Sequence, residues 1–101
     1  MAKFEINYLP IAQQDLVDIL EYIQIDNPSA ALNLLGEIDQ VISGLEDFPQ
    51  LGFIPKDNHL KNLGYRILVV NNYLVFYVIL NESVEIRRII HGKRKYDFIL
   101  S

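Results

Sequence analysis

The spacing of apolar residues divides the first half of the chain into one strand and two helices. Residues 3–8 alternate apolar and polar side chains, which is the period of a half-buried strand. Pro10 then fits the first turn of a helix, and Asn27 with Pro28 predicts the end of that helix and the N-cap of a second one. The first stripe is Ala12, Leu16, Ile19, Leu20 and Ile23, and the second, which runs to about Glu46, is Ala31, Leu34, Leu35, Ile38, Val41, Ile42 and Leu45.

Two helices joined by so short a link are expected to fold back as an antiparallel hairpin that covers one face of a sheet. Gly36 and Gly44 interrupt the second stripe, each at a cost of about 1 kcal/mol relative to alanine, and close approach to the first helix would explain both. Tyr22, Tyr73 and Tyr77 fall within apolar stripes, which predicts that they belong to the core.

The second half changes to the pattern of β-strands. Prolines, glycine and mixed polar groups predict an irregular connection over residues 47–63. Strands are expected over 65–70, 73–80 and 84–90, as three consecutive antiparallel strands, with the middle one inside the sheet because both of its alternations are apolar. The tail from residue 93 to 101 is expected to form a short helical turn or a docked extension. The predicted fold class is α+β in the order β-α-α-β-β-β, as a single domain over residues 1–101.

Composition excludes several kinds of chemistry. The 101 residues are half apolar, enough for one domain with a core, and they contain no cysteine, so disulfides, thiolate nucleophiles and cysteine-based zinc sites are excluded. Two histidines in unrelated contexts are too few for a convincing metal cluster, so neither a metal nor a cofactor is expected. The longest uncharged apolar run, Tyr73 to Leu80, is too short to cross a membrane, and no secretory signal follows Lys3. A cytoplasmic protein without membrane contact is expected.

The net charge of −4 conceals an asymmetry along the chain. Residues 1–60 hold two basic and ten acidic side chains, whereas residues 61–101 hold seven basic and three acidic ones. Because salt screens charges beyond about 8 to 10 Å, an anionic partner is expected to meet the second half.

Seven short sequence motifs, taken in their order along the chain and on the predicted elements, resemble the RelE/ParE toxin family over essentially the whole chain. Each motif alone occurs by chance, and their combination is what is specific. They are Tyr8-x-Pro10-x-Ala12 with Asp15-Leu16; Ile19 with Tyr22-Ile23; Asn27-Pro28-x-Ala30-Ala31; Ile42-x-x-Leu45-x-x-Phe48-Pro49-x-x-Gly52; Tyr65-Arg66-x-Leu68-Val69; Asn72-Tyr73-Leu74-Val75-Phe76-Tyr77; and Arg88-Ile89-Ile90-His91-Gly92-x-Arg94.

The resemblance implies the toxin of a bacterial type II toxin-antitoxin pair, of the plasmid stabilisation type. A cognate antitoxin would neutralise the toxin by wrapping an extended or helical segment around the helices and sheet. The basic second half of the chain would then be a binding surface for an acidic segment of the antitoxin. Two activities are known in the family, poisoning of DNA gyrase and cleavage of messenger RNA on the ribosome. Whether the toxin forms a homodimer or a hetero-oligomer with its antitoxin stays open.

The two activities need different chemistry. A metal-free ribonuclease must activate a ribose hydroxyl, stabilise charge on phosphate and protonate the leaving oxygen, which calls for basic side chains and a titratable group. A gyrase poison needs only a binding surface. The catalytic candidates for the ribonuclease are Arg66, His91, Arg94 and Tyr96, and the candidates for binding substrate or partner are Arg88, Lys93 and Lys95.

Departures from the RelE-like pattern favour the gyrase-type or another non-catalytic action. Leu68 and Leu74 stand where RelE-like enzymes carry further basic residues, and the carboxy-terminal tyrosine of those enzymes would fall near Leu100. Arg94 is expected beside Arg66 if the family's fold holds. The ribonuclease remains the alternative, and an inactive toxin-like binding module is a second one, so whether the protein is an enzyme stays open.

Simpler roles compete with each candidate. Arg87 and Arg88 are neighbours on a strand and should face opposite sides unless a bulge intervenes, so one would be a solvated charge while the other pairs with Glu85 or a helix carboxylate. His91 precedes a glycine turn and would equally serve to cap it. Residues 93–95 form a charge run of the kind that is usually solvated.

Overall fold

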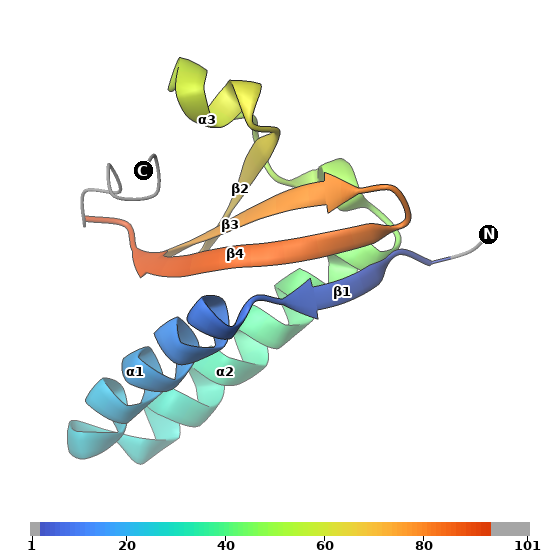
Figure 1. The fold of residues 1–101 in the computed structure, drawn as a ribbon. Helices are drawn as coiled ribbons and strands as arrows, with labels where there is room; N and C mark the ends of the chain where they lie inside the picture. Colours follow the sequence, from blue (N-terminus) through green and yellow to red (C-terminus); the bar gives the residue numbers. More distant parts are fainter. Residues whose placement is uncertain (1–2, 94–101) are drawn as a thin grey trace.

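A computed structural model describes residues 3–93, in which a two-helix hairpin lies against one face of a four-stranded sheet (Figure 1). The predicted α+β order is confirmed. The main elements are β1 (Glu5–Tyr8), α1 (Pro10–Asp26), α2 (Pro28–Ser43), β2 (Tyr65–Val70), β3 (Tyr73–Leu80) and β4 (Ser83–His91).

The sheet has the strand order β1-β4-β3-β2. Antiparallel pairing of β2 with β3 and of β3 with β4 confirms the predicted three-stranded unit. β1 pairs with β4 in parallel, with Tyr8 opposite Ile86, a contact that the local pattern did not predict. β4 extends past the end of β1, and α1 packs along that remaining part.

The helix boundaries follow from their caps. The Asn27 side chain accepts a hydrogen bond from the Ala30 amide at 3.1 Å, and Pro28 occupies the first turn, as predicted. α2 ends at Ser43 rather than near Glu46, and a 3-10 turn, η1 (Gly44–Glu46), continues it. Leu45 on that turn is fully buried, so the apolar stripe persists where the α-helix does not.

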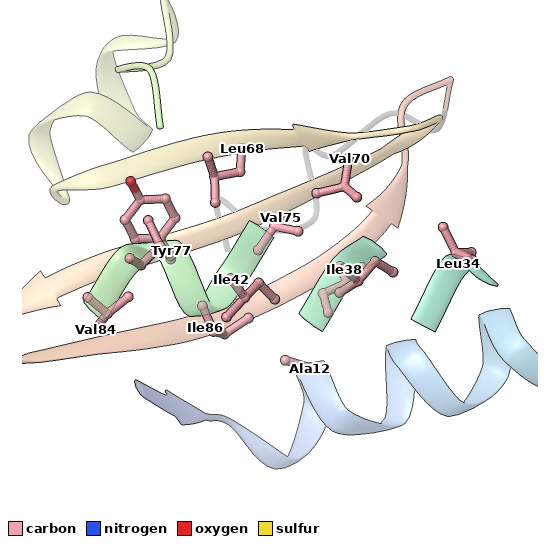
Figure 2. Packing of buried hydrophobic residues seen from close by; sticks show 12 residues of the cluster. Ala12, Leu34, Ile38, Ile42, Leu68, Val70, Val75, Tyr77, Val84 and Ile86 are labelled. Carbon is pink, nitrogen blue, oxygen red and sulfur yellow. The ribbon is translucent and has the colours of Figure 1, made fainter. Parts of the chain in front are cut away.

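The core has two parts, one on each face of the sheet. The hairpin-side cluster joins α2 to the sheet through twelve buried residues, among them Ile38, Ile42, Val75, Tyr77 and Ile86 (Figure 2). The opposite cluster consists of Leu60, Tyr65, Ile67, Phe76, Val78 and Ile90. Because Val75 and Tyr77 belong to one cluster and Phe76 and Val78 to the other, β3 is buried on both faces, as predicted.

The connection between helix and sheet is more ordered than expected, so the prediction of an irregular segment over 47–63 was wrong. It contains a second 3-10 turn, η2 (Pro49–Leu51), and a short helix, α3 (Asn58–Asn62), whose first turn is capped by the Asp57 side chain. Phe53 and Ile67 exchange both backbone hydrogen bonds at 2.9 Å. This bridge ties the connection to the outer edge of β2.

Two further expectations were wrong. Tyr22 is 79% exposed and is therefore not part of the core. Gly36 is not explained by close helix packing, since an added Cβ would meet no atom within 4 Å, and at Gly44 the nearest atom belongs to Leu51 rather than to α1.

The Tyr77 side chain on β3 holds the connection between α2 and β2 by hydrogen bonds to its backbone. Its buried hydroxyl accepts a hydrogen bond from the Gly52 amide at 2.8 Å and donates one to the Pro49 carbonyl at 2.6 Å. Arg66 donates to the carbonyls of Gly52 at 2.9 Å and Gln50 at 3.3 Å. One tyrosine on β3 and one arginine on β2 therefore satisfy the backbone groups of η2 and the residues beside it.

Alkaline pH is expected to destabilise the fold through this tyrosine. Burial raises the pKa of Tyr77 above the ordinary value of 10.0, while the Gly52 amide and the Arg66 charge lower it in part. The unfolded chain then loses this proton first as pH rises, so the stabilisation is complete below pH 10 and is lost as pH passes through the folded-state pKa. Denaturant unfolding from pH 7 to 11 measures the effect.

The matched variants separate Tyr77 from general alkaline damage. Tyr77→Phe should lose about 1 to 3 kcal/mol at pH 7, because the Gly52 amide and Pro49 carbonyl would be buried without their partner, and should lose less than the wild type between pH 10 and 11. Tyr22→Phe, at an exposed position, should change neither. An unchanged alkaline slope in Tyr77→Phe would rule out this assignment.

Candidate functional site

A β-bulge brings two arginines to the same face of β4. Phe76 lies opposite Arg88 and Tyr77 lies opposite Ile86, so Arg87 is an extra residue in the strand. Ile86 and Ile89 both pack into the hairpin-side cluster, which leaves Arg87 and Arg88 together on the other face. The Arg87 guanidinium lies 5.7 Å from the centre of the Tyr65 ring on that face.

Arg88 is held by a carboxylate of α1. Its Nε and Nη2 donate to the two oxygens of Asp15 at 2.8 and 2.9 Å, and the Ile89 amide donates to the same carboxylate at 3.0 Å. The hydrogen bond to Asp15 raises the pKa of Arg88 above its usual value, against the lowering effect of burial. Asp15 thus accepts the hydrogen bond of a backbone amide on the edge of β4 that β1 no longer covers. The expected pairing of one arginine with a helix carboxylate is confirmed.

Arg87 is paired as well, so the expectation that one of the two arginines is a solvated charge was wrong. Its Nε lies 2.6 Å from Glu85 Oε1. The Glu85 and Arg87 side chains are 25% and 32% exposed, against 12% and 17% for Asp15 and Arg88. The pair of Asp15 and Arg88 is therefore the more desolvated one, and the pair of Glu85 and Arg87 is the more accessible one.

Arg66 lies on the opposite face of the sheet. It is paired with Tyr77 across the β2–β3 ladder and lies on the same face of β2 as Leu68 and Val70, which are members of the hairpin-side cluster. Arg88 is paired with Phe76, a member of the other cluster. The structure therefore does not bring these two arginines together.

His91 closes the end of β4. Its Nδ1 accepts a hydrogen bond from the Lys93 amide at 3.1 Å, which confirms the turn-capping role, and its ring meets the edge of Tyr73 with the centroids 5.3 Å apart. The Lys93 side chain is exposed. Arg94, Lys95 and Tyr96 lie outside the described residues, as does the tail for which a helical turn was expected, so their predicted roles stay predictions.

A cleft of about 340 Å³ lies between α1 and the end of β4, and His91 is part of its wall. Tyr22 and Asp18 enter this cleft from α1, although neither was among the predicted site residues. Asp15, which also lines it, was predicted only as an unspecified helix carboxylate. The full lining is Asp15, Asp18, Ile19, Tyr22, Tyr73, Ile89, Ile90 and His91.

Within residues 3–93, no group of three or more histidine and acidic side chains is arranged to hold a metal ion. No helix in the same range is long and apolar enough to cross a membrane.

Comparison with known proteins places this geometry in a family. The family described as "ParE toxin of type II toxin-antitoxin system, parDE" matches residues 6–96. No curated protein sequence matches the chain.

Three solved structures share the fold at low sequence identity. The chromosomal ParDE toxin-antitoxin system from P. aeruginosa matches with a TM-score of 0.76 at 17% identity, over 90% of this chain and 98% of that one. The YoeB-YefM complex from Staphylococcus aureus gives 0.57 at 19% identity, over 94% and 100%. A conserved hypothetical protein from Helicobacter pylori gives 0.56 at 16% identity, over 92% and 99%.

The hairpin, the sheet order and these likenesses show that the chain shares the fold of these solved structures. Because the family match spans nearly the whole sequence, the chain belongs to the ParE toxin family of type II toxin-antitoxin systems.

Proposed function

We propose that this ParE-type toxin arrests bacterial growth by binding and poisoning DNA gyrase rather than by cleaving messenger RNA. The observation that carries the proposal is that two arginines use their guanidinium groups to hold the fold, on opposite faces of the sheet: Arg66, a catalytic candidate for the ribonuclease, and Arg88, a candidate for binding substrate or partner. The membership of the ParE family supports the same reading.

Ribonuclease chemistry would have to displace these internal contacts. A scissile phosphate approaching Arg88 must compete with a bidentate carboxylate that also holds the Ile89 amide. At Arg66 it must compete with two backbone carbonyls of the connection. Catalysis by charge stabilisation needs donors that are already aimed at the reacting group, and these donors are aimed at the protein itself.

Neutralisation by a cognate antitoxin is the second part of the proposal. The similar P. aeruginosa and S. aureus proteins come from a ParDE system and a YoeB-YefM complex, respectively. By analogy, this toxin pairs with an antitoxin encoded by an adjoining gene.

Expression of the toxin alone in a bacterium tests both parts. We expect growth arrest with cleaved DNA and loss of supercoiling, intact messages, inhibition of purified gyrase, and recovery when the adjoining gene is co-expressed. Message cleavage at the ribosome, abolished by Arg94→Ala, would overturn the gyrase proposal in favour of the ribonuclease. Normal growth at verified expression would overturn it in favour of an inactive binding module.

A further inference from the structure

The connection between α2 and β2 exposes several large apolar side chains that follow one another closely along the chain. Their exposed fractions are 67% for Phe48, 56% for Leu51, 53% for Phe53 and 50% for Ile54. We call these residues the connection patch. None of them belongs to either of the hydrophobic clusters that cover the sheet. A concentrated apolar surface of this kind on a folded domain marks a site of contact with another protein.

The backbone that carries the connection patch is held in place before any partner binds. Hydrogen bonds with the side chains of Tyr77 and Arg66 fix η2 and Gly52 to the sheet. Phe53 itself exchanges both backbone hydrogen bonds with Ile67 on β2. Because this backbone is already ordered, little conformational freedom is lost when a partner covers the patch, which favours binding.

The charges beside the patch indicate the kind of partner that it fits. Residues 47–56 carry one acidic and one basic side chain, Asp47 and Lys56, and both are exposed. The next carboxylate, Asp57, caps α3. A segment without net charge lacks the excess of cations on which nucleic-acid binding depends. The segment runs from the end of η1 towards α3 (Figure 1), so its acidic and basic side chains lie at its two ends.

We propose that the connection patch binds the same patch on a second copy of this chain, so that the two copies are related by a two-fold axis. An axis perpendicular to the segment reverses its direction in the second copy. Asp47 of each copy then faces Lys56 of the other, and the apolar side chains meet between these two ion pairs. The patch is therefore complementary to itself in charge as well as in its apolar character.

The size of the patch fits a reversible dimer. A large aromatic side chain has about 150 to 250 Å² of surface, so each patch side chain, half to two thirds exposed, offers roughly 100 Å². The two copies together would bury about 800 Å² from these side chains, before the surrounding polar groups are added, and stable interfaces bury about 1,200 to 2,000 Å² in total. We therefore expect a Kd of about 1 to 100 µM. The turn of the helical hairpin lies at the opposite end of α2 (Figure 1), so it stays accessible in the dimer.

Analytical ultracentrifugation of the purified toxin tests the apolar part of the interface. The wild type should pass from monomer to dimer over about 1 to 100 µM, and Phe48→Ser should weaken the dimer by at least about tenfold. The matched control is Ile25→Ser, which removes an apolar side chain that is 81% exposed near the hairpin turn and should leave the dimer as it is in the wild type. Melting temperatures equal to that of the wild type exclude misfolding of the variants.

Exchange of charges tests the two-fold arrangement. Asp47→Lys alone and Lys56→Asp alone should each weaken the dimer by about tenfold at low salt, because like charges then meet at both ends of the patch. Mixed in equal amounts, these two variants should form a heterodimer as tight as the wild-type dimer, because every contact again joins opposite charges. Glu82→Lys, on the turn between β3 and β4, makes the same change of charge as Asp47→Lys at another exposed position and should dimerise like the wild type.

Each outcome supports or overturns the dimer independently of the target. A wild type that stays monomeric up to about 1 mM contradicts the proposal. A dimer that Phe48→Ser leaves unchanged, or that the mixed charge variants do not restore, shows that the copies meet in another way, and the proposal is then wrong. If the wild type is monomeric and Phe48→Ser abolishes inhibition of gyrase, the patch contacts the target instead, and only the proposed function stands. A toxin that dimerises through the patch without arresting growth would leave the dimer and remove the gyrase proposal.

Discussion

Replacement of Gly52 by alanine is expected to lower the free energy of unfolding by about 3 kcal/mol, the largest loss that a single added methyl group should cause in this chain. A Cβ at this position would lie 2.7 Å from both Cε1 and the hydroxyl of Tyr77 and 2.8 Å from the Ile67 carbonyl oxygen. Backbone and a buried ring cannot both move aside. The strain would also disturb the hydrogen bonds through which Tyr77 and Arg66 hold the connection.

Gly36→Ala provides the matched control, with the opposite sign. The same methyl group meets nothing within 4 Å in the middle of α2, so helix propensity alone should raise stability by about 0.5 to 1 kcal/mol. Denaturant unfolding of the two variants measures both effects. A loss of under about 1 kcal/mol in Gly52→Ala would mean that the contacts of Tyr77 do not fix the connection.

This glycine shows where sequence reasoning was strong and where it failed. The motif Phe48-Pro49-x-x-Gly52 contributed to the family resemblance, and Pro49 begins η2. The reason for Gly52 is a tyrosine 25 residues later along the chain, which no local pattern contains. The regular structure of the connection over residues 47–63 was not predicted for the same reason, because the Tyr77 hydroxyl that holds it belongs to β3.

Elements were predictable because their causes are local. Period-2 and period-3.6 spacing and the Asn27 cap each act within a few residues, and they place all four strands and the two long helices. Asn71 and Asn81 adopt positive φ angles of 57° and 52°, as tight turns between strands require. The position of Tyr22 was predicted wrongly because the sequence shows which side of a helix is apolar, but not how much of that side other elements cover.

The candidate site was harder to predict because the bulge changes which face a side chain occupies. Simple alternation would place Arg87 and Arg88 on opposite faces, and one extra residue puts both on the face away from the hairpin. The partner of Arg88 is 73 residues away in sequence, so only the packing of α1 along β4 selects Asp15. Composition showed a basic half but could not show that three of its arginines are engaged within the protein.

The ion pair between Arg88 and Asp15 leads to the second large effect that we expect, a loss of stability when Asp15 is replaced. Asp15→Ala should lower the free energy of unfolding by about 3 kcal/mol, because it leaves the guanidinium of Arg88, with a side chain 17% exposed, without its carboxylate and removes the acceptor of the Ile89 amide. Asp18 lies about one turn later on α1, where it accepts a hydrogen bond from Gln14 at an exposed site, so Asp18→Ala should change stability by under about 0.5 kcal/mol.

Adding Arg88→Met to Asp15→Ala should recover part of the loss, because the long apolar side chain leaves no charge without a partner. We expect a coupling energy of about 1 to 2 kcal/mol from the double-mutant cycle, measured by denaturant unfolding. Additive losses would mean that the ion pair contributes nothing beyond its separate parts. The same double variant also separates folding from action. If Arg88 and Asp15 serve only the fold, the variant still arrests growth, whereas loss of arrest in a stably folded variant would show that at least one of them contacts the target.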